Sequence, residues 1–146
     1  MIWLLRHGDA EREGDEDARR LTEKGERQAD HAGRALAELG VRVDACLSSP
    51  KIRALDTARI VAGHLGVDAE AAGELAGGEF DPARLAAGRG EVLLVGHEPD
   101  LSRAVGDATG GRVEMKKGGL AGIEDRSLVA LLRPEQLEAI ARGARG

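Results

Sequence analysis

The sequence predicts an α/β fold in three layers, with a mostly parallel central sheet and an antiparallel hairpin near the C-terminus. Short apolar runs at 1–6, 44–47 and 91–96 have the length of buried strands, and helical patterns near 22–39 and 50–65 separate them. Strands that alternate with helices are typical of a parallel sheet covered by helices on both faces. Two further strand-like runs lie close together near the end of the chain, which predicts the hairpin.

The two long helices have recognisable ends. The first is expected to begin at Thr22, a residue type that caps helix N-termini, and to end at Gly40. The second is expected to have Ser49 as its N-cap and Pro50 as its first helical residue, and to stop at Gly66.

The remaining segments are less regular. The charged stretch 11–20 is expected to be a solvated loop, and the Gly- and Ala-rich stretch 73–90 is a candidate mobile flap. The later elements are expected to be a short helix that starts at Pro82, a helix near 99–107, a turn at 109–111, a hairpin of 119–124 with 127–132, and a last helix from Pro134 to about Arg142.

The composition narrows the class of protein. We expect residues 1–146 to form a single domain, because this length supports one hydrophobic core. The net charge of -5 argues against a general nucleic-acid-binding protein, which needs a basic face. The one cysteine, Cys46, excludes an internal disulfide and a cysteine-rich metal site. Since no apolar run has the length of a membrane span or a signal peptide, we expect a cytoplasmic protein without a membrane partner. We also expect it to be a monomer or a weak dimer.

The most informative segment is Arg6-His7-Gly8, which directly follows the apolar run at the start of the chain. A buried strand that ends in this tripeptide delivers a guanidinium and an imidazole to the edge of the sheet. In open α/β sheets, ligands bind at that edge, outside the carboxyl ends of the strands. Gly8 allows a sharp turn and the close approach of a bound group.

Two later segments repeat this arrangement. Ser48-Ser49-Pro50 follows the second strand-like run, and Arg53 falls in the first turn of the helix after it. A helix N-terminus attracts anions, and a guanidinium can bind two phosphate oxygens at once. His97 follows the third strand-like run. We therefore expect the two histidines and two arginines to surround one tetrahedral anion.

These motifs, in this order, resemble the histidine phosphatase superfamily and, within it, the short SixA-like phosphohistidine phosphatases. The resemblance covers nearly the whole chain. The segments that carry it are Arg6-His7-Gly8-Asp9-Ala10, Leu21–Ala29, Ser48-Ser49-Pro50 with Arg53 and Thr57-Ala58, Gly96-His97-Glu98-Pro99, and Lys116–Ala121. The resemblance implies a phosphoglycerate mutase-like fold and a phosphatase that uses no metal or other cofactor.

The resemblance also implies a role for each site residue. His7 is the implied nucleophile, which would form a covalent phosphohistidine, while Arg6, Arg53 and His97 would bind the phosphoryl oxygens. The positive charge of the arginines disfavours protonation of His7, so its ring is expected to stay nucleophilic at neutral pH. The further residues that we expect to bind substrate are Gly8, Ser49, Asp9 and Lys117.

The proton donor for the leaving group is open. Glu74 is the first choice, because related larger phosphatases and mutases place an acidic residue near this region; Asp9, Asp17 and Glu79 are the alternatives. An alkoxide needs a proton in order to depart, whereas the imidazole of a phosphohistidine leaves easily once its ring is protonated. An enzyme that cleaves a P–N bond therefore tolerates a poor general acid.

The same residues disfavour three other functions. Zinc binding is disfavoured, because arginines beside both histidine segments would repel a dication. A phosphate-binding module without turnover is expected to lack His7 or an arginine, and a small phosphomutase needs a lid for which this chain has little material. The expected partner is a phosphorylated protein that carries phosphohistidine, or else a small phosphorylated metabolite.

Overall fold

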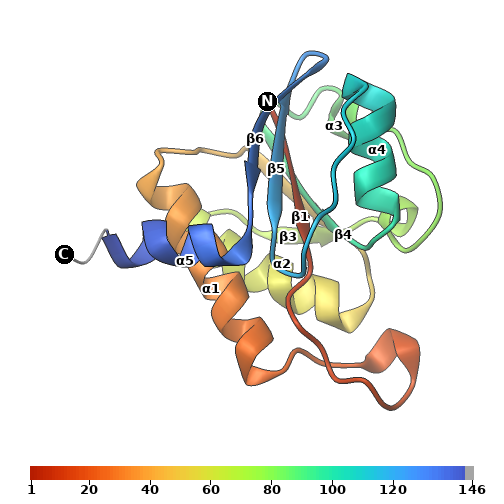
Figure 1. Cartoon of the computed structure of the whole chain (residues 1–146). Helices are drawn as coiled ribbons and strands as arrows, with labels where there is room; N and C mark the ends of the chain where they lie inside the picture. Colours follow the sequence, from red (N-terminus) through yellow and green to blue (C-terminus); the bar gives the residue numbers. More distant parts are fainter. Residues whose placement is uncertain (144–146) are drawn as a thin grey trace.

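Six strands form one mixed sheet at the centre of the molecule (Figure 1). The computed structural model describes residues 1–143, and the last three residues of the chain lie outside the described part. The strands are β1 (Ile2–Arg6), β2 (Ala45–Ser48), β3 (Ala69–Ala71), β4 (Val92–Gly96), β5 (Leu120–Glu124) and β6 (Ser127–Leu132). Their order is β3-β2-β4-β1-β5-β6. The strands β1 to β4 run parallel, whereas β5 pairs antiparallel with β1 and with β6, which confirms the mostly parallel sheet and its hairpin.

Helices cover both faces of the sheet and complete three layers (Figure 1). The helices are α1 (Glu23–Glu38), α2 (Ile52–Leu65), α3 (Pro82–Ala86), α4 (Asp100–Thr109) and α5 (Pro134–Gly143), with the 3₁₀ turns η1 (Glu16–Ala18) and η2 (Gly73–Leu75). On one face α1 packs against both α2 and α5, and α3 and α4 lie on the other face. The predicted α/β class is confirmed.

The core follows the alternation of side chains along the central strands. Trp3 and Leu5 of β1 pack under α1, α2 and α5, whereas Leu4 between them packs against α4. On α1 the buried positions include Ala29 and Ala32, whose small side chains let the helix lie close to the sheet. Each fully buried leucine contributes roughly 1.5–3 kcal/mol relative to an exposed one, so the two faces together anchor β1 firmly.

The N-terminus of α1 is as predicted, and that of α2 is not. Thr22 is the N-cap of α1, and its hydroxyl accepts from the Gly25 N–H at 3.1 Å. The helix α2 begins at Ile52, with Lys51 as the N-cap, so the prediction of Ser49 as cap was wrong. The Ser49 hydroxyl instead accepts from the Lys51 N–H within a short turn that precedes the helix.

The less regular elements agree with expectation in one detail and differ from it in two. The short helix α3 starts at Pro82 as predicted, with the Asp81 side chain as its cap. The helix α4 continues through Thr109, so the turn begins at Gly110. The edge strand β3 was not predicted, because its sequence Ala-Glu-Ala has neither branched nor aromatic residues. The mobility of 73–90 stays a prediction, as does the single domain over 1–146.

Candidate active site

The carboxyl ends of β1, β2 and β4 lie side by side at one edge of the sheet. Arg6, the last residue of β1, is in register with Gly96, the last residue of β4. Backbone hydrogen bonds continue past the strand ends: the His7 N–H donates to the Gly96 carbonyl at 3.2 Å, and the Ser49 N–H donates to the Val95 carbonyl at 3.0 Å. The three segments that the sequence places at strand ends are therefore brought together.

His7 and His97 face each other at this edge. Their ring centroids are 5.2 Å apart, and each residue is only 7% exposed. The Nδ1 atom of His7 lies 2.7 Å from the Gly8 carbonyl oxygen. Because a carbonyl only accepts hydrogen bonds, Nδ1 must carry a proton, which leaves a lone pair on Nε2 when the ring is neutral. The His7 ring can therefore act through Nε2 as a nucleophile or a base.

Burial keeps both rings neutral at pH 7. Desolvation is the main cause that lowers the pKa of His7 to about 4; the hydrogen bond to the Gly8 carbonyl opposes it, and nearby cations, Arg53 first, add to it. Desolvation, followed by the proximity of His7, lowers the pKa of His97 to about 3. The expected neutral His7 is thus explained by burial first and by the arginines second.

Arg53 lies in the first turn of α2, as expected, and is 5% exposed. Its Nη1 donates to the Glu16 backbone carbonyl at 2.5 Å, and its Nη2 donates to the Glu16 carboxylate at 3.2 Å. Lys51 Nζ donates to the same carboxylate oxygen at 3.2 Å. The hydrogen bonds from Lys51 and Arg53 lower the pKa of Glu16, so its carboxylate is charged and occupies donors that could hold another anion. Glu16 therefore departs from the expectation of a simple solvated loop.

A chain of hydrogen bonds that begins at Glu98 holds the Arg6 guanidinium. The Glu98 carboxylate accepts from the Ser102 N–H at 2.8 Å and from the Ser102 hydroxyl at 2.5 Å. That hydroxyl accepts from the Met115 N–H at 3.2 Å, and the Met115 carbonyl accepts from Arg6 Nη1 at 2.9 Å. Glu98 therefore orients Arg6 through two intermediate residues. No role was predicted for Glu98, although its position next to His97 was an available signal.

The loop after β1 is fixed by contacts with α1 and α2. The Gly8 N–H donates to Thr57 Oγ1 at 3.1 Å, and this hydroxyl donates to the Arg53 carbonyl at 2.7 Å. A Cβ on Gly8 would lie 2.5 Å from the Gly25 carbonyl oxygen, and one on Gly25 would lie 2.0 Å from the Asp9 carbonyl oxygen. Backbone thus packs directly on backbone, which requires glycine at both positions. The role of Thr57 was missed, although it lies in one of the motifs that carry the resemblance.

The other predicted binding residues also lie at this edge. The Ser49 hydroxyl is 2.7 Å from Nε2 of His97. The Asp9 carboxylate accepts from the Thr22 hydroxyl at 2.8 Å and from Lys117 Nζ at 3.3 Å, and these contacts, with the Thr22 bond first, lower the pKa of Asp9. Asp9 and Lys117 line a cavity of about 570 Å³ together with Arg6. Their contact with a substrate stays a prediction.

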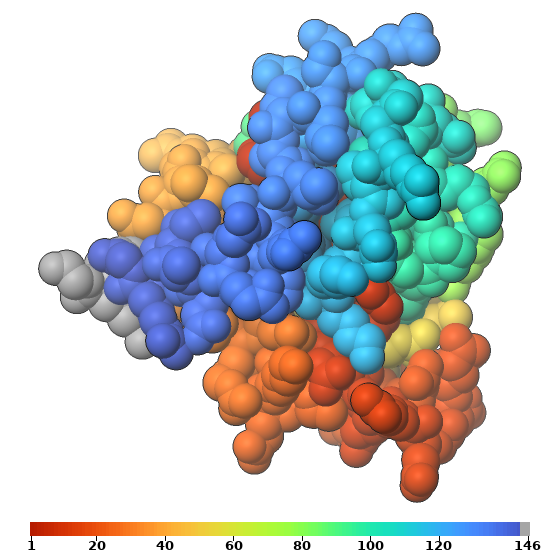
Figure 2. Space-filling model, in the orientation of Figure 1, coloured from red at the N-terminus to blue at the C-terminus, as the bar shows by residue number. Residues whose placement is uncertain are grey.

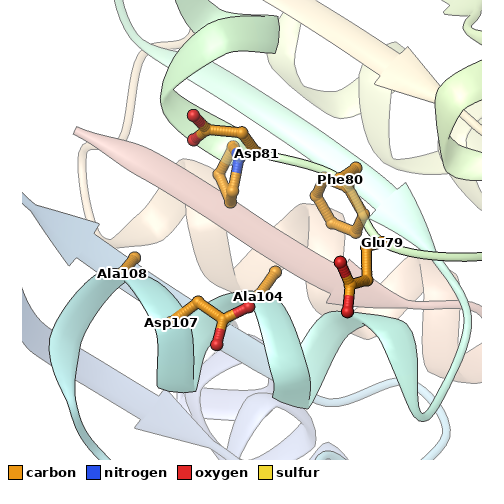
Figure 3. Close-up of a pocket in the computed structure, with 7 residues that line it drawn as sticks. Glu79, Phe80, Asp81, Ala104, Asp107 and Ala108 are labelled. Carbon is orange, nitrogen blue, oxygen red and sulfur yellow. The ribbon is translucent and has the colours of Figure 1, made fainter.

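The remaining candidates for the proton donor are Glu74, Glu79 and Asp17. Glu74 is exposed on η2, and it lines a cavity of about 530 Å³ together with Glu79 and Arg84. Glu79 also lines a second cavity, of about 420 Å³, beside Phe80 (Figure 3). None of the four main site residues, namely Arg6, His7, Arg53 and His97, lines either cavity. Asp17 Oδ1 lies 4.0 Å from Lys51 Nζ. The assignment of a proton donor stays a prediction for each of them.

Residues 1–143 contain neither a metal-binding cluster nor a membrane-spanning helix. In this part of the chain, no three His, Cys, Asp or Glu side chains are grouped so that they could hold a metal ion. No helix there combines the length and the apolar character needed to cross a membrane. Cys46 is buried in β2, and burial raises the pKa of its thiol to about 12, so the thiol stays protonated.

The sequence is similar to those of known phosphatases. The family model of the histidine phosphatase superfamily (branch 1) matches residues 2–84, which is more than half of the chain. Among curated proteins, the mitochondrial serine/threonine-protein phosphatase Pgam5 of Drosophila ananassae is 40% identical over 70 residues, and that of Drosophila persimilis is 43% identical over 61 residues. The two matches cover 47% and 41% of this chain, and it spans only 24% and 21% of the length of those relatives.

Comparison with solved structures extends over nearly the whole chain. The protein histidine phosphatase SixA, solved with tungstate, has a TM-score of 0.80 at 23% identity, and the match covers 93% of this chain and 98% of that one. SixA of Agrobacterium tumefaciens has a TM-score of 0.75 at 24% identity, with 91% and 97% covered. These similarities establish the phosphoglycerate mutase-like fold. The family model, which matches more than half of the chain, shows that the chain belongs to the histidine phosphatase superfamily.

Proposed function

We propose that the protein is a metal-independent phosphatase that forms a covalent phosphohistidine at His7 and acts on phosphohistidine in a protein substrate. The observation that carries this proposal is the state of His7. Its Nδ1 is committed to the Gly8 carbonyl, its ring is neutral because its pKa is about 4, and cations surround it. A neutral imidazole with a free Nε2, held among guanidinium groups, is suited to attack a phosphoryl group.

In the proposed first step, Nε2 of His7 attacks phosphorus in line and forms a new P–N bond. The bond to the leaving group breaks, and that group departs with the electron pair. Arg6 and Arg53 stabilise the negative charge on the equatorial oxygens, and His97 adds a hydrogen bond. Water then attacks the phosphorylated His7, which releases inorganic phosphate and restores the free ring.

The state of the neighbouring carboxylates supports a nitrogen leaving group. The two that bind the cations of the site, Asp9 and Glu16, have a lowered pKa and are ionised at pH 7. An ionised carboxylate is a poor proton donor. An imidazole that is protonated on its second nitrogen departs as a neutral ring, so a phosphohistidine substrate needs little help from the enzyme. The likeness to SixA, whose name as a protein histidine phosphatase states its activity, favours the same class.

The test of the proposed nucleophile is the trapping of the intermediate. We expect an aryl phosphate to be hydrolysed with chelator present, and rapid quenching to trap acid-labile phosphate on His7. The His7→Ala variant should lose both turnover and label. Full activity in that variant would remove the proposed nucleophile. If the wild-type protein bound phosphate but hydrolysed no phosphorylated substrate, it would be a recognition module instead.

The substrate class is tested by comparing leaving groups. We expect kcat/KM to fall from a phosphohistidine protein to an aryl phosphate and again to alkyl phosphates, because the need for a donated proton grows in that order. A flat profile, or a preference for an alkyl phosphate, would contradict the phosphohistidine assignment and favour a small phosphorylated metabolite. Transfer of phosphate to a second alcohol rather than to water would point to a phosphomutase.

A further inference from the structure

A groove leads away from the candidate active site between α1 and α5. Its first part is the cavity of about 570 Å³ that Arg6 lines. A second cavity, of about 410 Å³, continues along the same two helices. Four residues line both parts, namely Lys24 and Gln28 on one face of α1 and Pro134 and Glu135 at the start of α5. Figure 2 views the face of the molecule on which α1 (orange) and α5 (dark blue) meet. The groove is thus elongated and starts at a residue of the site.

The first part of this groove is basic, although the chain is acidic overall. Five of its lining side chains are cationic, and two, Asp9 and Glu135, are anionic. Asp9 is itself paired with Lys117. The chain as a whole carries a net charge of -5. A local excess of cations beside an anion site attracts a further negative charge. The negative charge of the rest of the protein repels polyanions and so lowers their non-specific binding elsewhere.

The cations are held at a fixed distance from the proposed nucleophile. Lys116 and Lys117 belong to the loop that precedes β5, and the next residue, Gly118, donates its N–H to the carbonyls of both Arg6 and His7, at 3.1 and 3.0 Å. Gly118 has a φ of 77°, which favours glycine. This loop therefore cannot move away from the active site without breaking backbone hydrogen bonds to it.

We propose that this groove binds an extended acidic segment of the phosphorylated protein, with glutamate or aspartate side chains flanking the phosphorylated residue. The inference rests on the proposed function and adds the sequence context of its substrate. The elongated shape favours a polypeptide over a compact metabolite, because only an extended chain reaches from Arg6 into the second cavity. Lys24 and Arg133 would bind the acidic side chains, and so would Lys116, whose Nζ exchanges the exposed Glu114 carboxylate at 3.1 Å for one of the substrate; the phosphoryl group lies at His7.

The test uses two phosphohistidine peptides of equal length, one with glutamates around the phosphorylated residue and one with glutamines. We expect kcat/KM to be about tenfold higher for the acidic peptide at low salt, since several exposed ion pairs of modest strength add up to this factor. The preference should decline as salt rises towards the physiological range. In the double variant Lys116→Gln/Arg133→Gln the ratio should fall towards one.

The matched control is Arg126→Gln, which removes an exposed cation at the turn of the β5–β6 hairpin, outside the lining of both cavities. This variant should keep the wild-type ratio. A ratio near one in the wild-type protein, or a preference that survives in Lys116→Gln/Arg133→Gln, would overturn the proposal. A small bisphosphate that is preferred as strongly as the acidic peptide, with the same dependence on the variants, would also overturn it in favour of a metabolite.

A binding measurement separates this proposal from the phosphatase activity itself. Fluorescence anisotropy measures how tightly the His7→Ala variant binds the labelled glutamate and glutamine peptides. Because this variant has no turnover, the measurement reports the preference in binding alone. We expect the acidic peptide to bind more tightly there as well. If the wild-type protein hydrolysed no phosphate while this preference persisted, the proposed function would fail and the acidic-segment site would stand. Equal binding of the two peptides would contradict the site alone.

Discussion

At the scale of single residues, Glu16 is the least expected part of the candidate active site. It lies in a charged stretch without periodicity, and its partner Arg53 is 37 residues away in the sequence. Nothing in the local sequence signals such a pair. Its carboxylate holds Arg53 and Lys51 at the place where the proposed phosphoryl group would be bound. Glu16 is therefore in competition with any anion that uses the same donors.

The Glu16→Gln variant tests this competition. We expect orthovanadate, which imitates a phosphoryl group, to inhibit the variant at about two- to fivefold lower concentration, the range expected when one ion pair is released. The backbone contact from Glu16 to Arg53 remains in the variant, so the guanidinium stays in place. The control is Glu13→Gln, which removes an exposed carboxylate from the same loop. Weaker inhibition of Glu16→Gln would show instead that the carboxylate orients Arg53.

At the scale of elements, the first turn of α1 sets the position of the loop that carries His7. The contact is between the backbones at Gly8, Asp9 and Gly25, with no side chain between them. The helix therefore fixes the turn after β1 more rigidly than side-chain packing would, since a backbone contact has no rotamers to adjust. The site is held in place by a helix that contributes none of the four main site residues.

Two glycines inside helices are expected to respond in opposite ways to substitution by alanine. In Gly25→Ala, the new Cβ would lie 2.0 Å from the Asp9 carbonyl, so α1 must move; we expect a loss of roughly 2–4 kcal/mol in the free energy of unfolding and loss of turnover. In Gly63→Ala of α2, nothing lies within 4 Å, and alanine should stabilise the helix by roughly 0.5–1 kcal/mol. Urea unfolding measures both. Similar stability changes in the two variants would contradict the proposed close contact.

The elements that could be predicted are those with strong local patterns. The strands that end at Arg6 and Gly96 are continuous apolar runs, and Thr22 marks the start of α1, so each is visible in a short window. The start of α2 was misplaced because a serine before a proline is a general cap signal, whereas here Ser49 turns towards His97. The edge strand β3 forms only because β2 is already in place beside it. In both cases, contacts with residues that are distant in the sequence determine the local structure.

The candidate site could also be predicted only as far as local patterns in the sequence determine it. Residues at the ends of parallel strands must meet at one edge, which places His7 near His97 from the sequence alone. The links that orient them, such as the one from Glu98 to Arg6, pass through residues that are distant in the sequence and have no shared pattern. A proton donor on an exposed segment has even less to fix its side chain, and Glu74 illustrates this.

At the scale of the whole molecule, two buried neutral histidines link folding to pH. Below about pH 6.5 the unfolded chain binds a proton on each ring, whereas the folded protein does so only near pH 4 at His7 and near pH 3 at His97. The unfolded state therefore binds more protons in this window, so the stability of the fold decreases as the pH falls through it.

This linkage predicts a loss of stability in mild acid. We expect the free energy of unfolding to fall between pH 6.5 and 4 by up to about 1.4 kcal/mol per pH unit for each ring. Urea unfolding at several pH values in phosphate-free buffer measures the slope. In the variant His7→Asn/His97→Asn, which has no titrating ring at these positions, the slope should flatten. An unchanged slope would mean that other groups cause the acid sensitivity.

The place of β1 in the sheet has a consequence for how the protein is made. The strand β1 is synthesised before the other strands of the sheet, yet its two neighbours, β4 and β5, lie in the second half of the sequence. During translation its edges stay open while most of the polypeptide emerges from the ribosome. A nascent chain that pauses before residue 120 still exposes one edge of an apolar strand, which makes it a target for chaperones and for pairing with another copy.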